Sequence, residues 1–192
     1  MQINNSVRAV ERILSEVDRA TGTFLGKVSL KCPVGCAKCC HGQQVSASPI
    51  EFLPYAYHLY ETGTLEDRYW EFKTNTKTSC LLVEGNNDGS NGRCSTYAYR
   101  GVICRLFGNA AMINKEGKKS YSGCSILKSQ IAAQPQFESQ LQLSAPIYSD
   151  FYMKLRNIDN TNGALIVPIN IAIVKSMEIV YNNTRRKRKK IS

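Results

Sequence analysis

The cysteines are the residues of this sequence whose type and spacing could support chemistry, namely the binding of a metal. The chain holds 8 cysteines in 192 residues, and four of them crowd into the segment 32–40. That segment contains a Cys-x2-Cys step, which lets a tight turn aim two sulfurs at one ion while nearby amides offset the thiolate charge. Thiolates are ligands for zinc and for iron–sulfur clusters. We therefore predict a metal centre whose candidate ligands are Cys32, Cys36, Cys39, Cys40, Cys80, Cys94, Cys104 and Cys124.

The adjacent pair Cys39 and Cys40 bears on how many centres there are. Neighbouring side chains cannot easily point the same way, so the two thiols could serve different metal ions, or one could be spare. Eight thiols exceed one tetrahedral zinc site, which favours an iron–sulfur cluster, although two zinc ions with four cysteines each would use the same number. Cys80, beside two leucines, could also be an ordinary core residue. Zinc or iron–sulfur, and one centre or two, stay open.

The cellular compartment decides between metal and disulfides. Charged residues interrupt the first 26 residues, so no secretory signal is indicated, and no run of about 18 apolar residues predicts a membrane span. These features predict a cytoplasmic protein with no membrane partner. In a reducing compartment clustered thiols bind metal more often than they form disulfides, so an extracellular disulfide scaffold is the less favoured reading.

The net charge of +10 is concentrated at the C-terminus. Six consecutive basic residues, 185–190, supply six of these charges and leave the rest of the chain at +4. We predict one metal-binding domain over 1–183, with its cysteine core at 32–124, and a basic, disordered tail at 184–192. The tail could bind nucleic acid, but a solvated tail without a partner is favoured.

Helices are expected on both sides of the cysteines. Apolar residues at three- and four-residue spacing predict a helix over 4–20 that Gly22 and Gly26 break. Ser48, Pro49 and Glu51 form a capping box with proline in the first turn, which predicts a helix from there to about residue 60. Further helices are expected over 65–73, 126–133, 147–156 and 168–181.

Between these helices the sequence predicts two hairpins. Segments 80–83 and 94–99 read as strands around a loop rich in Asn, Asp and Gly, and segments 110–113 and 115–121 read as a second, short hairpin. The expected fold is thus an α-rich α+β domain, in which a cysteine-dense loop and hairpin form the metal centre and helices surround it. No phosphate-binding glycine loop and no Ser-His-Asp arrangement is present.

A few residues near the cysteines have candidate secondary roles. Arg100 and Arg105 could bind the metal cofactor by hydrogen-bonding cluster sulfurs or by neutralising thiolates, or they could form surface ion pairs. His41 could be a ligand, but eight thiols are available, and His58 is expected to pack within its helix. Alternation in the segment 97–99 predicts that one tyrosine packs inward and the other shields the site.

Two blocks of the sequence resemble a known family. They are Cys36-Ala37-Lys38-Cys39-Cys40 and the run Cys94-Ser95-Thr96-Tyr97-Ala98-Tyr99-Arg100-Gly101-Val102-Ile103-Cys104-Arg105-Leu106-Phe107. The pattern is similar to that of the CxxCxxCC zinc- or iron-chelating domains, also known as YkgJ-type cysteine cluster proteins. The first spacing here is Cys-x3-Cys rather than Cys-x2-Cys, and Gly101 replaces the family's proline. The resemblance implies a metal centre and leaves the reaction open.

Three classes of function remain. The favoured one is a cysteine cluster protein that holds an iron–sulfur cluster, zinc or iron. Such a protein could be a redox or metal-dependent enzyme, for instance an oxidoreductase. A structural zinc module would hold a saturated, colourless site. A nucleic-acid or protein adaptor would combine zinc with the basic tail. The sequence identifies neither a substrate nor a redox partner.

Overall fold

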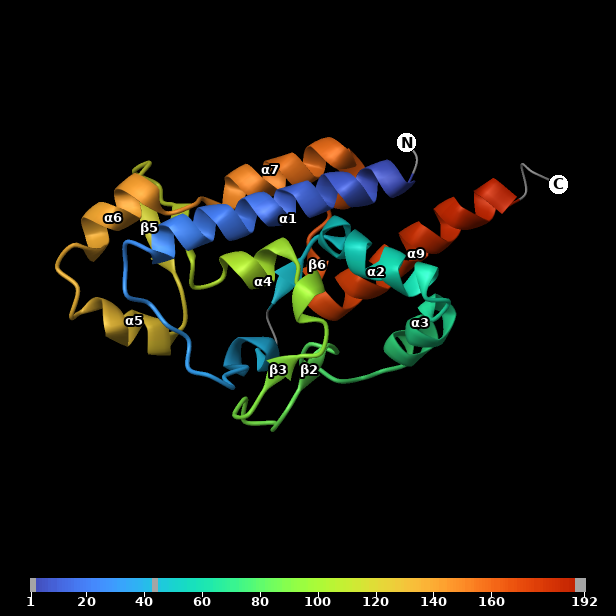
Figure 1. Ribbon diagram of the computed structural model, residues 1–192, viewed down its shortest axis with the longest axis horizontal. Helices are drawn as coiled ribbons and strands as arrows, with labels where there is room; N and C mark the ends of the chain where they lie inside the picture. The colour runs from blue at the N-terminus through green and yellow to red at the C-terminus, as the bar shows by residue number, and fades with distance from the viewer. Residues whose placement is uncertain (1–2, 43–44, 189–192) are drawn as a thin grey trace.

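The protein is described here by a computed structural model of residues 3–42 and 45–188, with side chains through Thr184. It is 58% helical, and its three sheets have two strands each, which confirms the predicted α-rich α+β class. Figure 1 shows α1, α7, α2 and α9 in an upper layer, with the β2–β3 hairpin and the cysteine segment below them. The cysteine-rich region thus lies beneath these helices.

Helix α1 (Ile3–Leu25) runs along much of the molecule. Its buried residues recur at three- and four-residue spacing: Ile3, Ser6, Val7, Val10, Ile13, Leu14, Val17, Thr21 and Phe24. The expected break at Gly22 was wrong. The helix continues through it because Thr21 and Phe24 carry the buried face onward, and packing of an apolar face outweighs a weak local propensity. The chain leaves the helix at Gly26, whose N–H donates to Gly22 O at 2.9 Å.

The second helical group surrounds the capping box. Ser48 and Glu51 cap η2 (Pro49–Phe52) as expected, and the chain continues into α2 (Leu53–Glu61) and α3 (Leu65–Lys73). Helix α9 (Ile169–Arg188) packs against all three elements. Pro168, expected in the first turn of that helix, instead ends strand β6 (Val167–Pro168), which pairs with β1 (Ser46–Ala47).

Most of the buried residues form one main core. It joins α1, α2 and α9 to α7 (Tyr148–Ile158), which Figure 1 shows alongside α1, and to the short helix α4 (Val102–Leu106). The short helix α8 (Asn160–Ala164) contacts α7 and η2. Its most deeply buried large side chains include Val10, Val17, Ile50, Phe52, Leu53, Leu106, Leu155, Ile173 and Met177. Helix α4 was not expected, since residues 102–106 lie between the two predicted hairpins and no element was predicted there.

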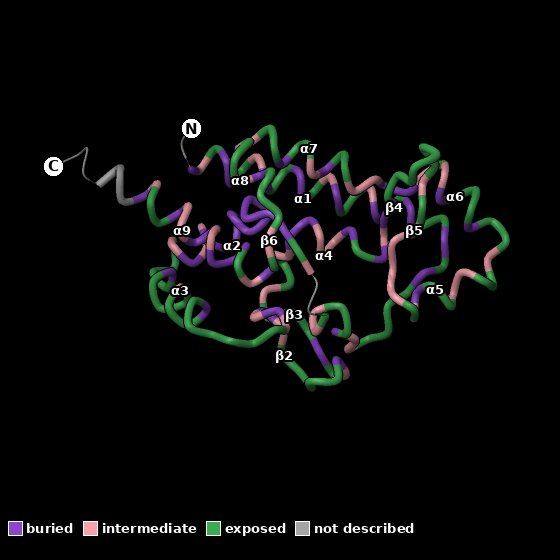
Figure 2. Tube along the Cα trace, turned by 180° about the vertical axis from the view of Figure 1, so that it is seen from behind, coloured by how far each residue is buried: buried purple, intermediate pink, exposed green. Residues whose placement is uncertain are grey.

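A separate second core occupies the other end of α1. It is built by the hairpin β4 (Ala110–Ile113) and β5 (Lys119–Ser122) and by α5 (Ser125–Ile131) and α6 (Phe137–Ser144). Its buried residues are Phe24, Val28, Leu30, Ala111, Leu127, Phe137, Leu141 and Ala145. Figure 2 shows this end as a small unit with α5 and α6 around a few buried segments. The expected second hairpin is confirmed here, whereas α6 was missed.

The first hairpin is shorter than expected. Only β2 (Val83–Glu84) and β3 (Arg93–Cys94) pair, and residues 97–99 form the 3-10 turn η3 rather than a strand. Another 3-10 turn, η1 (Lys38–His41), contains the adjacent cysteines. The loop between β2 and β3 is largely exposed (Figure 2), as its Asn, Asp and Gly content predicts.

The basic C-terminal run is partly described. Helix α9 continues to Arg188, so the backbone of residues 184–188 is helical, where a disordered tail was expected. Residues 189–192, the rest of that predicted tail, lie outside the described residues. No helix in the described part of the chain is long and apolar enough to cross a membrane.

Candidate metal centre

Backbone hydrogen bonds pin the cysteine loop, residues 32–42, onto the β2–β3 hairpin. Ala37 N donates to Gly89 O at 2.9 Å, and Gly92 N donates to Gly35 O at 2.7 Å. Gly35 has φ +72°, which glycine adopts without strain. A Cβ at Gly92 would lie 2.3 Å from the Ala37 Cβ, so only glycine allows this approach. The loop and the hairpin therefore form one layer.

Cys40, Cys80 and Cys94 meet at this layer. Cys80 N donates to Cys40 O at 2.8 Å, and Val83 N donates to Cys80 O at 3.1 Å. Val83 is paired with Cys94 across the hairpin. The segment before the hairpin is held from above, because Asn170 in α9 accepts a hydrogen bond from Leu81 N at 2.9 Å. The expected closeness of Cys80 and Cys94 in a hairpin is present.

Cys104 reaches the site from α4. The N-terminus of that helix is held by Glu51, whose Oε2 accepts from Ile103 N at 2.8 Å. Burial raises the pKa of the Cys104 thiol most, and the negative charges of Glu51, Cys80 and Cys94 raise it further. Cys104 therefore lies among the thiols of the loop–hairpin layer.

We call Cys40, Cys80, Cys94 and Cys104 the inner set. The pKa of the Cys80 thiol is raised to about 11, first by burial and then by the charges of Cys94 and Cys39. A hydrogen bond with Cys39, burial, and the charges of Cys39, Cys80 and Cys104 raise the pKa of Cys40. These charge effects link Cys40, Cys80, Cys94 and Cys104 as neighbours.

We call Cys32, Cys36, Cys39 and Cys124 the outer set. The pKa of Cys32 is raised to about 11 by burial first, and then by Cys36, Cys39 and Cys124. Cys124 comes from the second core, where it precedes α5. Gln130 of the same helix exchanges two hydrogen bonds of 2.9 Å with the backbone of Lys31, next to Cys32. The second core thus positions Cys124 directly and Cys32 through the backbone of Lys31.

Cys39 and Cys40 stand between the two sets. Their sulfur atoms lie 4.0 Å apart. The hydrogen bond from Cys40 is the largest of the effects that lower the pKa of Cys39, to about 6, and the charge of Arg100 adds to it. Cys39 is exposed and faces the outer set as well as Cys80, whereas Cys40 is half-buried and faces the inner set. Adjacent residues thus contribute to different groups.

All eight cysteines are free thiols. Among residues 3–42 and 45–188, no three His, Cys, Asp or Glu side chains already stand close enough to enclose a metal ion. The donor chemistry nevertheless suits zinc or iron, because the thiols collect from several segments around one layer.

The two arginines differ in their surroundings. Arg100 stacks on the Tyr97 ring, with its Cζ 3.5 Å from the ring centroid, and its charge acts on Cys39 and Cys104. Arg105 forms an ion pair with Asp18 and donates to Arg100 O at 2.8 Å and Ala98 O at 2.7 Å. Arg105 thus ties the 98–100 segment to α1. The predicted role of both at the thiols stays a prediction.

The nearby aromatic residues divide between packed and exposed positions, and the expectation that one tyrosine shields the site stays a prediction. Tyr99 stacks on His58 at 4.8 Å between ring centroids, which leaves His58 within the helical packing, while Tyr97 is exposed. His41 has a buried Nε2 for which the described residues offer no hydrogen-bond partner. A cavity of about 400 Å³ adjoins this cluster, and its walls include Tyr55, His58, Arg68, Thr96 and Tyr97.

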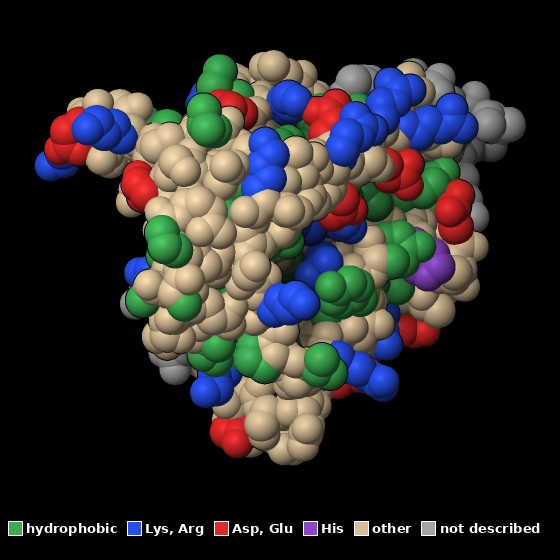
Figure 3. Space-filling view, turned by 60° about the vertical axis from the view of Figure 1, so that its left-hand side comes forward, with side chains coloured by type: hydrophobic (Ala, Val, Ile, Leu, Met, Phe, Trp, Pro, Cys, Tyr) green, Lys and Arg blue, Asp and Glu red, His purple; other side chains and the backbone are tan. Residues whose placement is uncertain are grey.

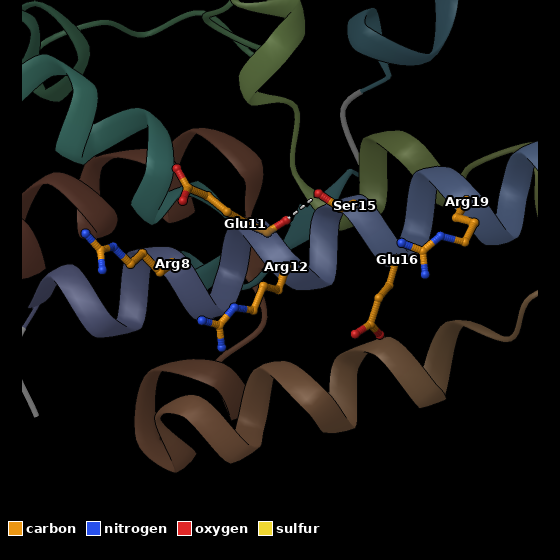
Figure 4. A pocket seen from close by; sticks show the side chains of 6 residues that line it. All are labelled: Arg8, Glu11, Arg12, Ser15, Glu16 and Arg19. Atoms are coloured by element: carbon orange, nitrogen blue, oxygen red, sulfur yellow. Dashed lines mark hydrogen bonds between the residues drawn. The ribbon is translucent and has the colours of Figure 1, made fainter.

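Another cavity, of about 420 Å³, lies along the outer face of α1 and contains no cysteine. Figure 4 shows its walls, made by Arg8, Glu11, Arg12, Ser15, Glu16 and Arg19, with α7 beside them. Glu16 forms an ion pair with Lys154 of α7. The mixed charges are those of a solvated helix face, and Figure 3 likewise shows basic and acidic side chains interspersed over the face it presents.

Comparison with known families agrees with this site. Residues 31–129 match the family model described as "CxxCxxCC: Putative zinc- or iron-chelating domain". The match covers just over half of the 192 residues. The chain belongs to this family. The CxxCxxCC region contains all eight cysteines, so the chain has a cysteine-rich domain of the zinc- or iron-chelating type. No curated protein and no solved structure matches the chain.

Sequence reasoning missed one residue of this CxxCxxCC domain. Glu51 was expected only to cap its own helix, and Ser48 N does donate to its Oε1 at 2.8 Å. The bond from Ile103 N to its other oxygen joins segments 52 residues apart. A local capping motif gives no signal for such a long-range partner. Gly101, next to α4, was the one residue in the sequence that could have indicated a close approach by another element.

Proposed function

We propose that the protein holds iron–sulfur clusters, or zinc or iron ions, through cysteine thiolates, and that the inner and outer sets are two separate centres. The observation that carries this proposal is the division of the adjacent pair. The charge of Cys40 interacts with Cys80 and Cys104, while that of Cys39 interacts with Cys32 and, at the boundary between the sets, with Cys80. Each set then has four thiols, which is the number that a tetrahedral zinc ion or a cubane iron–sulfur cluster requires.

The residues present fit such groups in chemistry and in charge. Four thiolates on one metal are strongly anionic, and Arg100 supplies a positive charge that acts on one thiol of each set, Cys39 and Cys104. Backbone hydrogen bonds between the cysteine loop and the hairpin stabilise the turn of the loop. We favour iron–sulfur, which when bound would supply one-electron transfer; zinc would supply structural cross-linking.

A reducing compartment would keep these thiols available for metal, and we propose the cytoplasm as the location. The redox partner, if the centre transfers electrons, would approach the exposed outer set, because Cys32 and Cys39 are the two exposed cysteines. Nucleic-acid binding through the basic residues 185–190 is not part of the proposal, because a charge run of this kind is more often solvated than bound to a partner.

Anaerobic purification tests the proposal. Metal content by mass spectrometry and the ultraviolet–visible spectrum are measured on the same sample. An iron–sulfur protein is coloured and bleaches on reduction, whereas zinc is colourless and is counted directly. Two centres predict two equivalents of zinc or two clusters per chain. Protein that retains no zinc or iron, and takes up neither on anaerobic reconstitution, would overturn the proposal.

A further inference from the structure

Glu51 is a carboxylate in an unusual place. Its residue is 0% exposed, the deepest burial of any charged residue whose side chain is described. A buried carboxylate is costly unless hydrogen bonds satisfy it. Both oxygens of Glu51 are used, with Oε1 accepting from Ser48 N and Oε2 accepting from Ile103 N, each at 2.8 Å. The capping box explains only the first of these bonds.

The second bond replaces a cap that α4 lacks. The residue at its N-cap position is Gly101, which has no side chain to accept a hydrogen bond. The first N–H groups of a helix need acceptors, and a carboxylate there also offsets their positive end. Glu51 supplies this acceptor from another element, and Tyr152 of α7 contacts the same carboxylate through its hydroxyl.

The close approach of Glu51 explains the glycine. A Cβ at Gly101 would lie 2.9 Å from Oε2 of Glu51 and 3.0 Å from Cζ of Phe52. A side chain at 101 would therefore push α4 away from the carboxylate. The N-terminus of α4 is thus capped by Glu51 from another element, and this cap requires that residue 101 have no side chain.

Cys104 lies one residue beyond Ile103, in the five-residue helix α4. The Cys104 thiol lies near enough to Glu51 for their charges to interact, and it is the inner-set ligand carried by that helix. We propose that Glu51 is a positioning residue that holds α4 so that the Cys104 thiol meets the inner set. The proposal rests on the proposed function, in which Cys104 is a metal ligand.

The test compares variants in metal-free and in anaerobically reconstituted protein. Glu51→Ala removes both bonds, and Asp159→Ala is the matched control. Asp159 also caps a short helix, because it accepts from Thr161 N and Asn162 N at 3.0 Å in α8, whose described hydrogen bonds include no cysteine. The readouts are the iodoacetamide labelling rate of Cys104 by peptide mass spectrometry and the metal content.

Glu51→Ala should speed labelling of Cys104 about fivefold, the change in open population that a lost helix cap gives. Its inner-set metal should fall as far as in Cys104→Ser. Asp159→Ala should change neither. In the double variant Glu51→Ala with Gly101→Ser, the contact with Oε2 is gone, and the Phe52 ring, whose Cζ lies 3.0 Å from the new Cβ, must shift by a few tenths of an ångström. The serine then caps α4 locally, so Cys104 labelling should return toward the wild-type rate.

Equal labelling in Glu51→Ala and wild type, or equal acceleration in both single-cap variants, would overturn the proposal. If Glu51→Ala does not fold, Glu51→Gln serves in its place, because its single amide oxygen can accept from only one of the two N–H groups while its NH2 faces the other. Labelling in metal-free protein does not depend on metal uptake. A wild type that takes up no metal therefore overturns the proposed function. Removal of the Glu51 charge also favours the Cys104 thiolate, so the decisive comparison is with the double variant, which lacks the same charge: faster labelling in Glu51→Ala that Gly101→Ser reverses establishes that Glu51 holds Cys104.

Discussion

The inner and outer thiol sets are attached to the molecule in different ways. The inner set stands against the main core: Cys80 is buried, and its other members pack against that core from the cysteine loop, the hairpin and α4. The outer set contains both exposed cysteines, Cys32 and Cys39, and draws Cys124 from the second core. One set therefore rests on a single folded unit, whereas the other spans two.

This difference indicates which parts of the fold each metal centre would hold together. Metal bound by the inner set would fasten loop and hairpin to a core that apolar packing already stabilises. Metal bound by the outer set would cross-link the second core to the cysteine loop, where only a few hydrogen bonds, such as those of Gln130 to Lys31, now act. We expect the outer centre to be the more accessible and the more labile of the two.

The largest expected effect separates the sets directly. Cys40→Ala should remove the inner metal, and Cys36→Ala the outer metal, so each variant should keep about half of the wild-type metal, as independent ligand sets require. Cys40→Ala should also lower the melting temperature more, because it leaves polar groups unpaired near the main core. Metal analysis and thermal unfolding of both variants check this.

The same pair of variants can contradict the division into two sets. If either substitution removes all the metal, the eight thiols form one shared centre and the division into sets is wrong. Cys32→Ala is the companion measurement. It should match Cys36→Ala in metal loss if the wider Cys-x3-Cys loop delivers a ligand, and retain full metal if it does not.

Partial metal removal should loosen the second core selectively. A mild chelator added under anaerobic conditions should take the exposed outer metal first. Amide hydrogen exchange in residues 108–145 should then accelerate, while exchange in α2 and α9 stays unchanged, because the main core does not depend on that cross-link. Exchange followed by mass spectrometry checks this, and uniform acceleration over the whole chain would contradict it.

The helices could be predicted better than the site. Helix α3 and the hairpin at 110–122 follow from local patterns, and the capping box located η2 and α2. Helix α4 could not be predicted, because its five residues are stabilised by Glu51 from another element. Grouping of the thiols was equally out of reach, since the sets are formed by contacts between segments far apart in the chain. Only the adjacency of Cys39 and Cys40 indicated two groups.

The boundary between the sets can be measured by titration. In metal-free protein, the pKa of Cys39 is lowered to about 6, chiefly by its hydrogen bond with Cys40. At pH 7 its thiolate should dominate, and its iodoacetamide reaction should slow as the pH falls through 6. Cys40→Ala should raise the pKa of Cys39 by about two units, toward that of an ordinary cysteine. A pH profile of Cys39 labelling in both proteins checks this; an unchanged profile would show that the pair does not interact.

Gly92→Ala tests the layer that supports both sets. The new Cβ would lie 2.3 Å from the Ala37 Cβ, so the cysteine loop must move off the hairpin, at a cost of about 1–3 kcal/mol in the free energy of unfolding. Metal content should fall as well. The control is Gly22→Ala, which meets nothing within 4 Å inside α1 and should stabilise by about 0.5–1 kcal/mol with full metal. Denaturant unfolding and metal analysis check both.

The smallest expected effect concerns how the second core holds Cys32. Gln130 accepts from Lys31 N and donates to Lys31 O, both at 2.9 Å, so its amide acts as a clamp directly before the first outer-set thiol. Gln130→Ala should destabilise the protein by only about 1 kcal/mol, because each exposed hydrogen bond has a small net value. Outer-set metal should nevertheless become more sensitive to chelator. Gln142→Ala is the matched control, since that amide clamps the backbone of Lys119 in the second core at a place without cysteine. If both variants release metal at the same chelator concentration, the second core acts through its overall stability; if only Gln130→Ala releases it early, the clamp at Lys31 sets the position of Cys32 itself.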